Sequence, residues 1–592
     1  MHEQPLTSEQ PRSAVQEMSA VHASTLFGVL EGRTLASSGV DEYLGVPYAE
    51  PPKRFADAVD WTAPYAGGWR SALTAGSMCV QPSGSSEWAF AGAEDCLYLN
   101  IWAPHRRNMS EPLPVMVWIH GGNFLLGDGA QYNASRLVEK HGSIFVTINY
   151  RLSSLGWTQV APGVANFGLR DQRSALRWVR ANAGGFGGDP HRICVFGESA
   201  GASSLVMHLL APASRGLFDA VLLESAYLVP KSPARSAQLA SAFFDEAGCG
   251  GERNESARLQ CLRAAPLARL WNATANVTAV PPGGGFLDSV TFGPVVDGVE
   301  LEARPFELIA RGALPSHVPL LAGVNTNEGS AFVFGGGVAL PMNASGYASY
   351  VSRLLRRLEL DRYTNLSEVL EVYPPANARA AADNAPLAAL LTADLVFDCT
   401  TRHLARALSS PVQPPESRAA RVGGASSRPE AVPVWMYRFN QRAKADTSEP
   451  LSWGVTHGSE VPFVFDRGEW IDAGDGGDED GGRTGGRGGD DTTESEATSF
   501  TPAEEQLATA IGAMWTRFGA ARPPLPAAAS WPAYTNASER QAVLAVAENG
   551  TVEQQQSPQP QKRGELPFAV EPPPRAFYCD FWSRVQLREE RR

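Results

Sequence analysis

Short apolar runs alternate with amphipathic stretches along the first half of the chain. Pro114–Ile119 (PVMVWI), Ile144–Asn149 (IFVTIN) and Arg192–Phe196 (RICVF) have the length and composition of buried parallel strands. Leu169–Ala183 places apolar residues at helical spacing, and Ala200–Leu210 follows the third strand as a helix. This alternation of strands and helices predicts an α/β fold, with a mostly parallel sheet covered by helices on both faces.

Segments of low complexity interrupt this pattern. Residues 1–22 are polar and predict a disordered leader. Three further stretches, near 411–432 (Pro/Ser/Arg/Gly-rich), 468–499 (Gly/Asp/Glu-rich) and 550–575 (Gln/Pro-rich), lack the apolar content to pack. We therefore expect them to be surface insertions or linkers.

Composition and charge narrow the classes of partner. The 592 residues are 43% hydrophobic and carry a formal net charge of −13, to which residues 466–496 contribute eleven acidic and three basic side chains. An acidic chain without a basic run is a poor candidate for binding nucleic acid or anionic membranes. No run of 18 apolar residues occurs, so no transmembrane helix is predicted.

Two features point to the secretory pathway, although the N-terminus shows no apolar signal-peptide segment. The chain has seven cysteines, which is typical of an oxidising compartment. It also has nine N-glycosylation sequons, so we expect a secreted or lumenal glycoprotein. The sequons begin at Asn108, Asn133, Asn254, Asn272, Asn276, Asn343, Asn365, Asn536 and Asn549.

The candidate nucleophile is Ser199. It lies in the sequence Gly197-Glu198-Ser199-Ala200-Gly201, which has the G-x-S-x-G pattern, between the strand RICVF and the following helix. A sharp strand-to-helix turn needs small neighbours, lifts the hydroxyl above the sheet and directs a helix N-terminus at the reacting carbonyl. The context predicts a nucleophile elbow rather than a structural glycine turn.

A glycine-rich turn, His120-Gly121-Gly122-Asn123, follows the strand PVMVWI. Acyl transfer passes through a tetrahedral oxyanion that needs preorganised N–H donors, and glycines allow the backbone to approach it. We expect the backbone amides of Gly122, Asn123 and Ala200 to form the oxyanion hole.

A serine nucleophile needs a base, which is usually histidine, and this fold places it after the serine and the acid. Of the ten histidines, His208 lies in the helix after Ser199, His317 precedes a strand, and His403 lies in a helical run. His457 lies in a glycine-flanked loop after the strand VWMYRF, so elimination favours it.

The residues alone leave the identity of the acid open. Glu328 follows the strand PLLAGV, and active sites of open α/β sheets gather at the carboxyl ends of strands. Asp297 and Asp394 remain rivals on spacing.

These motifs together resemble the type-B carboxylesterase/cholinesterase family of the α/β-hydrolase fold. The resemblance runs from about Leu44 to the C-terminus, interrupted by the low-complexity stretches. It is carried by YLGVPYAEPP, EDCLYLNIWAP, WIHGGNF, NFGLRDQRSALRWVRANAGGFGGDP, FGESAG, GVNTNEGS and THGSEVPFVF.

The resemblance implies that Glu328 is the catalytic acid and His457 the base, and that one catalytic domain spans residues 23–592. It implies a small ester as substrate and a reaction that needs no metal or other cofactor. It leaves the oligomeric state open. Its cysteine pattern implies the disulfides Cys79–Cys96, Cys249–Cys261 and Cys399–Cys579, with Cys194 free and buried.

The resemblance also bears on the substrate. Trp88, between Cys79 and Cys96, is near the place of the choline-binding tryptophan of cholinesterases, although a packed loop aromatic is the favoured interpretation. Segments 289–298 and 328–332 resemble the butyryl-preferring branch, and Asn123 replaces a glycine, which narrows the pocket without removing the donor. Candidate substrate-binding residues are Trp88, Glu198, Val290, Phe292, Ala331 and Phe332.

We therefore expect a broad carboxylesterase. A cholinesterase preferring butyryl-type choline esters is the alternative within the family. An adhesion protein of the neuroligin type would lack the nucleophile, and an interfacial lipase would need a longer apolar lid than the short loop between Cys79 and Cys96.

Overall fold

The computed structural model describes thirteen segments of the chain. They are residues 19–83, 89–228, 230–278, 291–311, 318–376, 383–409, 432–444, 450–467, 500–520, 533–534, 542–546, 552–556 and 575–590. The predicted insertion at 468–499, and that at 411–432 apart from residue 432, lie outside these ranges.

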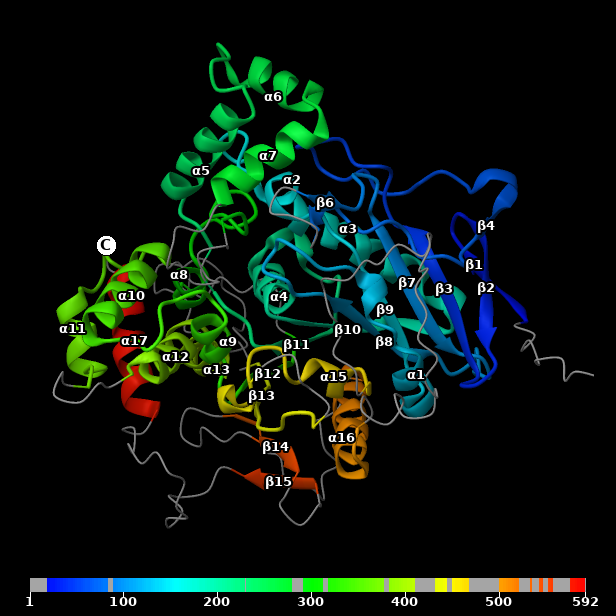
Figure 1. Ribbon diagram of the computed structural model, residues 1–592. Coiled ribbons are helices and arrows are strands. Elements are labelled where there is room, and N and C mark those ends of the chain that lie inside the picture. Colours follow the sequence, from blue (N-terminus) through cyan, green and yellow to red (C-terminus); the bar gives the residue numbers. More distant parts are fainter. Residues whose placement is uncertain are drawn as a thin grey trace, which may run out of the picture.

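One large sheet runs through the molecule (Figure 1). Its strands lie in the order β1-β2-β3-β7-β9-β8-β10-β11-β12-β13-β14-β15, and β4 pairs with β2. Neighbouring strands from β9 to β14 are parallel. The strands at both ends pair antiparallel, except that β4 runs parallel to β2. The strands are β1 Ala20–Thr25, β2 Gly28–Leu35, β3 Val40–Pro47, β4 Trp69–Ser71, β7 Tyr98–Pro104, β8 Leu113–Ile119, β9 Ile144–Ile148, β10 Gly188–Glu198, β11 Ala220–Glu224, β12 Leu320–Asn325, β13 Val434–Phe439, β14 Ala542–Val546 and β15 Val552–Gln556, with β5 Gln81–Pro82 and β6 Phe90–Ala91 in a separate pair.

Helices cover both faces of this sheet, as the sequence predicts. Successive residues of a strand point to opposite faces. In β8, Val117 belongs to the core cluster shared with α3 (Phe167–Asn182) and α4 (Ala200–Leu210), whereas Trp118 belongs to the cluster shared with α1 (Ser135–His141) and α16 (Pro502–Gly519). The predicted α/β fold is therefore confirmed.

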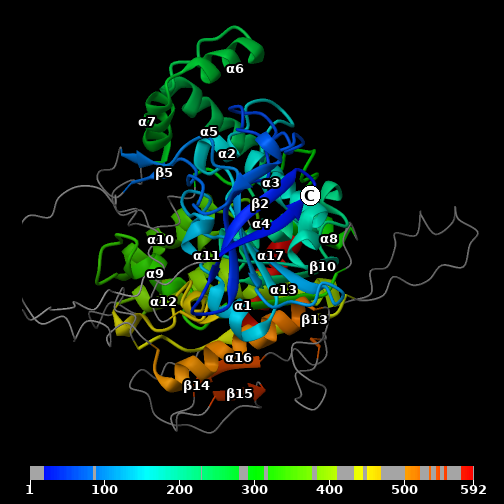
Figure 2. The same ribbon diagram turned by 90° about the vertical axis from the view of Figure 1, so that its right-hand side faces the viewer.

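Several of the remaining helices lie beyond the sheet (Figure 1). In Figure 1 and Figure 2, α5, α6 and α7 lie at one end of the molecule, while α16, β14 and β15 lie at the other. Red α17 lies beside the green helices α10–α12 in Figure 1, where a third core cluster joins them. These helices are α2 Ser153–Trp157, α5 Pro233–Glu246, α6 Glu255–Ala264, α7 Leu267–Thr278, α8 Pro305–Ala310, α9 Gly329–Phe334, α10 Ala344–Arg357, α11 Leu366–Val372, α12 Ala385–Ala393, a π-helical turn Asp394–Asp398, α13 Cys399–Ser409, α15 Val461–Val464 and α17 Arg575–Glu590.

Two boundaries differ from the sequence-based predictions. β1 begins at Ala20, inside the predicted leader of residues 1–22, because its backbone pairs with β2 in full register. β15 falls inside the predicted insertion at 550–575, where Val552 pairs opposite Val546 of β14. Both errors occur at an edge of the sheet, where backbone pairing supports a strand that has little apolar content. Among the described helices, none combines the length and apolarity needed to cross a membrane.

Candidate active site

Ser199 occupies a strained turn between β10 and α4. Its φ of 54° and ψ of −118° lie outside the regions that L-residues normally adopt. A Cβ at Gly201 would lie 1.9 Å from the Ile119 carbonyl oxygen, so only glycine allows the start of α4 to pack against the end of β8. This packing fixes the Ser199 side chain above the sheet, as the G-x-S-x-G pattern predicts.

The structure brings Ser199, His457 and Glu328 together from three separate segments. Ser199 Oγ lies 2.8 Å from His457 Nε2, and His457 Nδ1 lies 2.7 Å from Glu328 Oε2. In the tautomer protonated at Nδ1, the imidazole donates to the carboxylate and accepts a hydrogen bond from the serine hydroxyl. This is the geometry of a nucleophile, its base and an orienting acid.

Glu328 is held rigidly at the carboxyl end of β12. Its side chain is fully buried, and Oε1 accepts hydrogen bonds from the Asn325 backbone N–H at 2.6 Å and from Ser225 Oγ at 2.5 Å. The rivals are engaged elsewhere. Asp297 accepts from backbone amides of its own turn, and Asp394 accepts from Tyr373.

The other candidate histidines lie apart from Ser199. His208 is buried in α4 between Ser214 and Gln172, at 2.8 and 3.0 Å. His403 packs edge-on against Phe306 with 4.5 Å between ring centroids, while His317 lies outside the described residues. His457 is thus the histidine that the described structure places at the serine.

The predicted oxyanion turn lies directly against Ser199. A Cβ built at Gly121 would lie 3.2 Å from Ser199 Cβ, so the two segments touch. Gly122 and Asn123 both have positive φ, 87° and 62°, and a Cβ at Gly122 would meet the Leu126 carbonyl oxygen at 2.1 Å. Ala200 begins α4, whose first N–H groups have no partner within the helix. The turn and the helix start thus meet beside the serine hydroxyl.

Carboxyl groups dominate the electrostatics around His457. Glu198 Oε1 lies 3.1 Å from His457 Nε2, on the same nitrogen that faces the serine. Burial disfavours the imidazolium, but the charges of Glu198 and Glu328 outweigh it and raise the pKa of His457 to about 9. Burial in turn raises the pKa of Glu198 above the ordinary value for a glutamate.

The sequence did not predict the buried residues that fix the loop carrying His457. Glu460 is buried three residues after His457, and burial together with Glu198 and Glu328 raises its pKa to about 8. The amide of Asn325 donates to Glu460 Oε2 and, at 2.8 Å, to the Thr456 carbonyl, which ties the histidine loop to β12. Nothing in the local pattern distinguishes these buried polar groups from solvated loop residues.

Aromatic rings form one wall of the site. The His457 ring lies 4.6 Å from Phe397 and 5.1 Å from Phe332, measured between centroids. Phe397, from the π-helical turn, was not predicted, whereas Phe332 was. Phe292 packs on Phe243 with centroids 5.9 Å apart. Ala331 is half-buried in α9, and the predicted residues Trp88 and Val290 lie outside the described residues.

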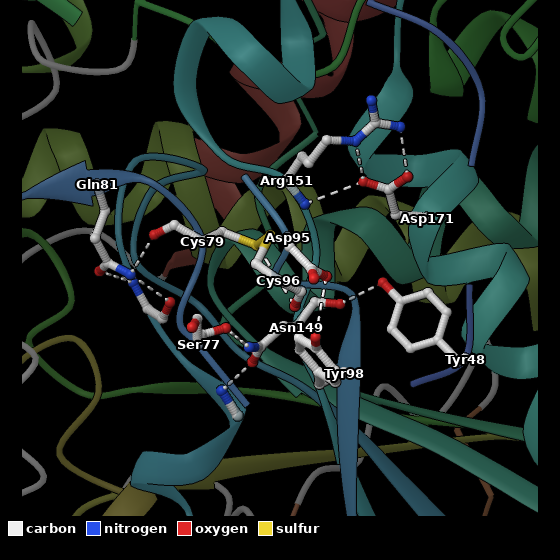
Figure 3. The surroundings of a disulfide bond; sticks show 12 residues. Tyr48, Ser77, Cys79, Gln81, Asp95, Cys96, Tyr98, Asn149, Arg151 and Asp171 are labelled. Atoms are coloured by element: carbon white, nitrogen blue, oxygen red, sulfur yellow. Dashed lines mark hydrogen bonds and ion pairs between the residues drawn. A yellow bond between two sulfur atoms is a disulfide. The ribbon is translucent and has the colours of Figure 1, made fainter. Parts of the chain in front are cut away.

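The structure contains the three disulfides that the resemblance implies: Cys79–Cys96, Cys249–Cys261 and Cys399–Cys579. Cys194 is free and buried. Figure 3 shows the first disulfide beside Gln81, whose amide donates at 3.0 Å to the carbonyls of both Cys79 and Gly127. Gly127 follows the oxyanion turn, so this disulfide loop is tied to the site.

Buried polar pairs lie around this disulfide (Figure 3). In Figure 3 the Arg151 guanidinium lies against the Asp171 carboxylate, with two hydrogen bonds of 2.7 and 2.6 Å. Tyr48 donates to the Asn149 carbonyl at 2.7 Å. Because both partners of each pair are buried, removing one would leave the other unsatisfied.

Comparisons with known proteins show which family the chain resembles. A model of the carboxylesterase family matches residues 17–563. The chain is 30% identical to a para-nitrobenzyl esterase of Bacillus subtilis over 92% of its own length and 98% of that protein, and 34% identical to a human bile salt-activated lipase over 54% and 43%. A solved structure of a PNB esterase superposes with a TM-score of 0.67 at 28% identity, covering 91% of this chain and 98% of the other.

Proposed function

The chain belongs to the carboxylesterase family and is a carboxylic ester hydrolase, and we propose that it acts through an acyl-enzyme formed on Ser199. The observation that carries this proposal is the continuous hydrogen-bonded series from Ser199 through His457 to Glu328. An adhesion protein of the neuroligin type would lack the nucleophile, whereas this chain carries Ser199 within hydrogen-bond distance of His457.

In the proposed mechanism, His457 Nε2 takes the proton of Ser199 as Oγ attacks the ester carbonyl carbon. Glu328 keeps the imidazole in the correct tautomer and stabilises its imidazolium form. The C–O bond to the alcohol then breaks, and His457 gives its proton to the departing alkoxide. A water molecule, activated by the same histidine, hydrolyses the acyl-enzyme and releases the acid.

The backbone amides of Gly122, Asn123 and Ala200 stabilise the oxyanion in each half of this cycle. Their position beside Ser199 supports this role, because both supporting turns are fixed by glycine contacts that a side chain would break. Preorganised donors of this kind typically contribute about a hundred- to a thousand-fold in rate.

For the substrate we propose a broad range of neutral carboxylic esters. The rings of Phe332 and Phe397 beside His457 form an apolar wall suited to acyl chains. Preference for choline esters is the second candidate, and it depends on Trp88.

A substrate panel tests both statements. Purified wild type and Ser199→Ala are compared on 4-nitrophenyl acetate, 4-nitrophenyl butyrate, butyrylthiocholine and a triglyceride emulsion. We expect wild type to hydrolyse the neutral esters and Ser199→Ala to lose at least about a thousand-fold in kcat. Equal rates for the two proteins would refute the acyl-enzyme on Ser199. Preference for butyrylthiocholine that Trp88→Ala abolishes would establish the choline-ester alternative.

We also propose that the chain is a glycoprotein of the secretory pathway. Three disulfides support this, as does the exposure of the sequon asparagines. Among the seven that the structure describes, six are exposed and Asn133 is half-buried. Treatment of the native protein with an N-glycosidase should lower its apparent mass, and an unchanged mass would contradict the proposal.

A further inference from the structure

A lysine lies at the end of the segment that leads away from the triad. β11 ends at Glu224, whose carbonyl accepts from the Ser199 N–H at 2.9 Å, and Ser225 contacts Glu328. The chain then passes Tyr227 to Lys231. The backbone of Lys231 bonds to Pro294 and Val296 at 2.9 and 3.0 Å, so its position is fixed at both sides.

The ammonium of Lys231 lies beside the ring that follows the oxyanion turn. A point at the Cβ position of Gly293 is 3.3 Å from Lys231 Nζ and 3.1 Å from Phe124 Cδ2. Phe124 directly follows the proposed oxyanion donor Asn123, and its ring packs against Tyr227 with centroids 6.1 Å apart. The Tyr227 ring in turn lies 6.3 Å from Phe397, which contacts His457. A series of neighbouring rings thus connects the surroundings of Lys231 to His457.

No acidic side chain neutralises this lysine within the described part of the chain. Glu359, the carboxylate whose charge favours the ammonium of Lys231, already accepts from the Ser232 backbone N–H at 3.0 Å and pairs with Arg304 and Arg362. The mechanism does not use Lys231 either. Partial burial of a cation without an ion-pair partner costs free energy, and binding of an anion would offset that cost.

Two arginines lie close enough to Lys231 for their charges to act on it. Burial, followed by the nearby charges of Arg357 and Arg235, lowers the pKa of Lys231 to about 7. Both arginines line a polar cavity of about 510 Å³. Three further arginines line it, Arg353, Arg356 and Arg362, against two acidic residues, Glu359 and Asp361. The chain as a whole has a net charge of −13, but this local excess of arginine creates a positive electrostatic potential that attracts anions.

We propose that Lys231 is a specificity-determining residue that binds the carboxylate of anionic ester substrates, with the arginine-lined cavity guiding them to it. This inference rests on the proposed function at Ser199. The substrates would be esters that carry a carboxylate besides the scissile group, such as hemiesters of dicarboxylic acids. Glu198 lies beside His457, whereas Lys231 lies beyond Phe124. The site therefore has a negatively charged part at the catalytic base and a positively charged part beyond Phe124.

The test compares anionic esters with neutral esters of the same shape. The first pair is 4-nitrophenyl hemiglutarate and 4-nitrophenyl 5-methylhexanoate, with the charge on the acyl side. The second is 4-acetoxybenzoate and 4-isopropylphenyl acetate, with the charge on the alcohol side. For each pair the anionic-to-neutral ratio of kcat/KM is measured in wild type, Lys231→Met and a control, Lys140→Met. Lys140 is also a lysine but lies in α1, on the other face of the sheet.

We expect Lys231→Met to lower the ratio by about ten- to a hundred-fold in one pair, because a charge-assisted hydrogen bond is lost, and to leave neutral esters within about three-fold. Lys140→Met should leave every ratio unchanged. Unchanged ratios in both pairs with Lys231→Met would overturn the proposal. Loss of hydrolysis only in Ser199→Ala, with no charge discrimination, would spare the proposed function and reject this inference alone.

A pH series provides a second readout that needs no disruptive variant. In a ratio of two kcat/KM values the ionisation of His457 cancels. The ratio in wild type should fall as pH rises through about 7, because Lys231 then loses its charge. Glu198 gains charge in the same range and contributes a decline of its own. Lys231→Arg stays cationic over this pH range, so any decline of its anionic-to-neutral ratio comes from Glu198 alone. If the ratio declines equally in Lys231→Arg and in wild type, the proposal is overturned.

Discussion

At the scale of single residues, the position of Glu198 distinguishes this site from a simple three-residue triad. Its carboxyl lies 3.1 Å from the nitrogen of His457 that must take the serine proton, and its charge also acts on buried Glu460. The sequence identifies Glu198 as a neighbour of the nucleophile and, through the family resemblance, as a candidate substrate-binding residue. Its contact with His457 depends on the fold of the turn, which no local pattern encodes.

Substitution Glu198→Gln should move the acid limb of the pH profile. Hydrolysis needs the neutral imidazole, so activity is lost as pH falls through the pKa of His457 in the free enzyme. Removing the adjacent charge lowers that pKa, and the acid limb of kcat/KM for 4-nitrophenyl butyrate should shift by about one pH unit or more to lower pH. Glu460→Gln, which removes a carboxyl that does not contact the imidazole, should shift it less. A shift to higher pH would contradict this electrostatic account.

At the scale of elements, the site is assembled at the carboxyl ends of β8, β10, β12 and of the segment after β13. Sequence periodicity predicts these strands well, because buried parallel strands are short apolar runs. It predicts the edge strands β1 and β15 poorly, because they depend on pairing with β2 and β14. The acid remained open on spacing among Glu328, Asp297 and Asp394, since only the packed loops show which carboxylate meets His457.

The contact between β8 and α4 can be tested with two alanine substitutions. Gly201→Ala places a methyl group 1.9 Å from the Ile119 carbonyl oxygen, so the nucleophile turn must move away from the oxyanion turn. We expect kcat/KM to fall by about a hundred-fold or more, since misplacement by about 1 Å has costs of that order. Gly184→Ala, where a Cβ meets no atom within 4 Å, should change neither the rate nor the unfolding free energy beyond about 0.5 kcal/mol. Equal rates for the two variants would count against the packing argument.

At the scale of the whole molecule, the disulfide Cys399–Cys579 joins the C-terminal helix to the wall of the site. It closes a sequence separation of 180 residues and fixes α17 next to the π-helical turn that carries Phe397. Trp582 donates to the Tyr373 hydroxyl at 3.0 Å in the same region. The extent of the catalytic domain, residues 23–592, stays a prediction.

The disulfides Cys399–Cys579 and Cys249–Cys261 should differ in their contribution to stability. Each disulfide removes conformational entropy from the unfolded chain and so raises its free energy. The loop-closure relation gives about 5 kcal/mol for Cys399–Cys579 and about 3 kcal/mol for Cys249–Cys261, whose separation is 12 residues. Replacing each pair by serines should therefore lower the free energy of unfolding more for the first, by about 2 kcal/mol. Denaturant titration of both variants measures the difference, and a larger loss for the shorter loop would contradict it.

The central claim is that Ser199 carries the acyl group, and covalent labelling tests it most directly. Diethyl 4-nitrophenyl phosphate reacts with an activated serine and leaves a stable diethyl phosphoryl group, which peptide mass spectrometry locates. The account predicts one label per chain, on the peptide that contains Ser199, with activity lost in proportion and no label in Ser199→Ala. Inactivation with the label on another residue, or complete labelling that leaves hydrolysis intact, would contradict it.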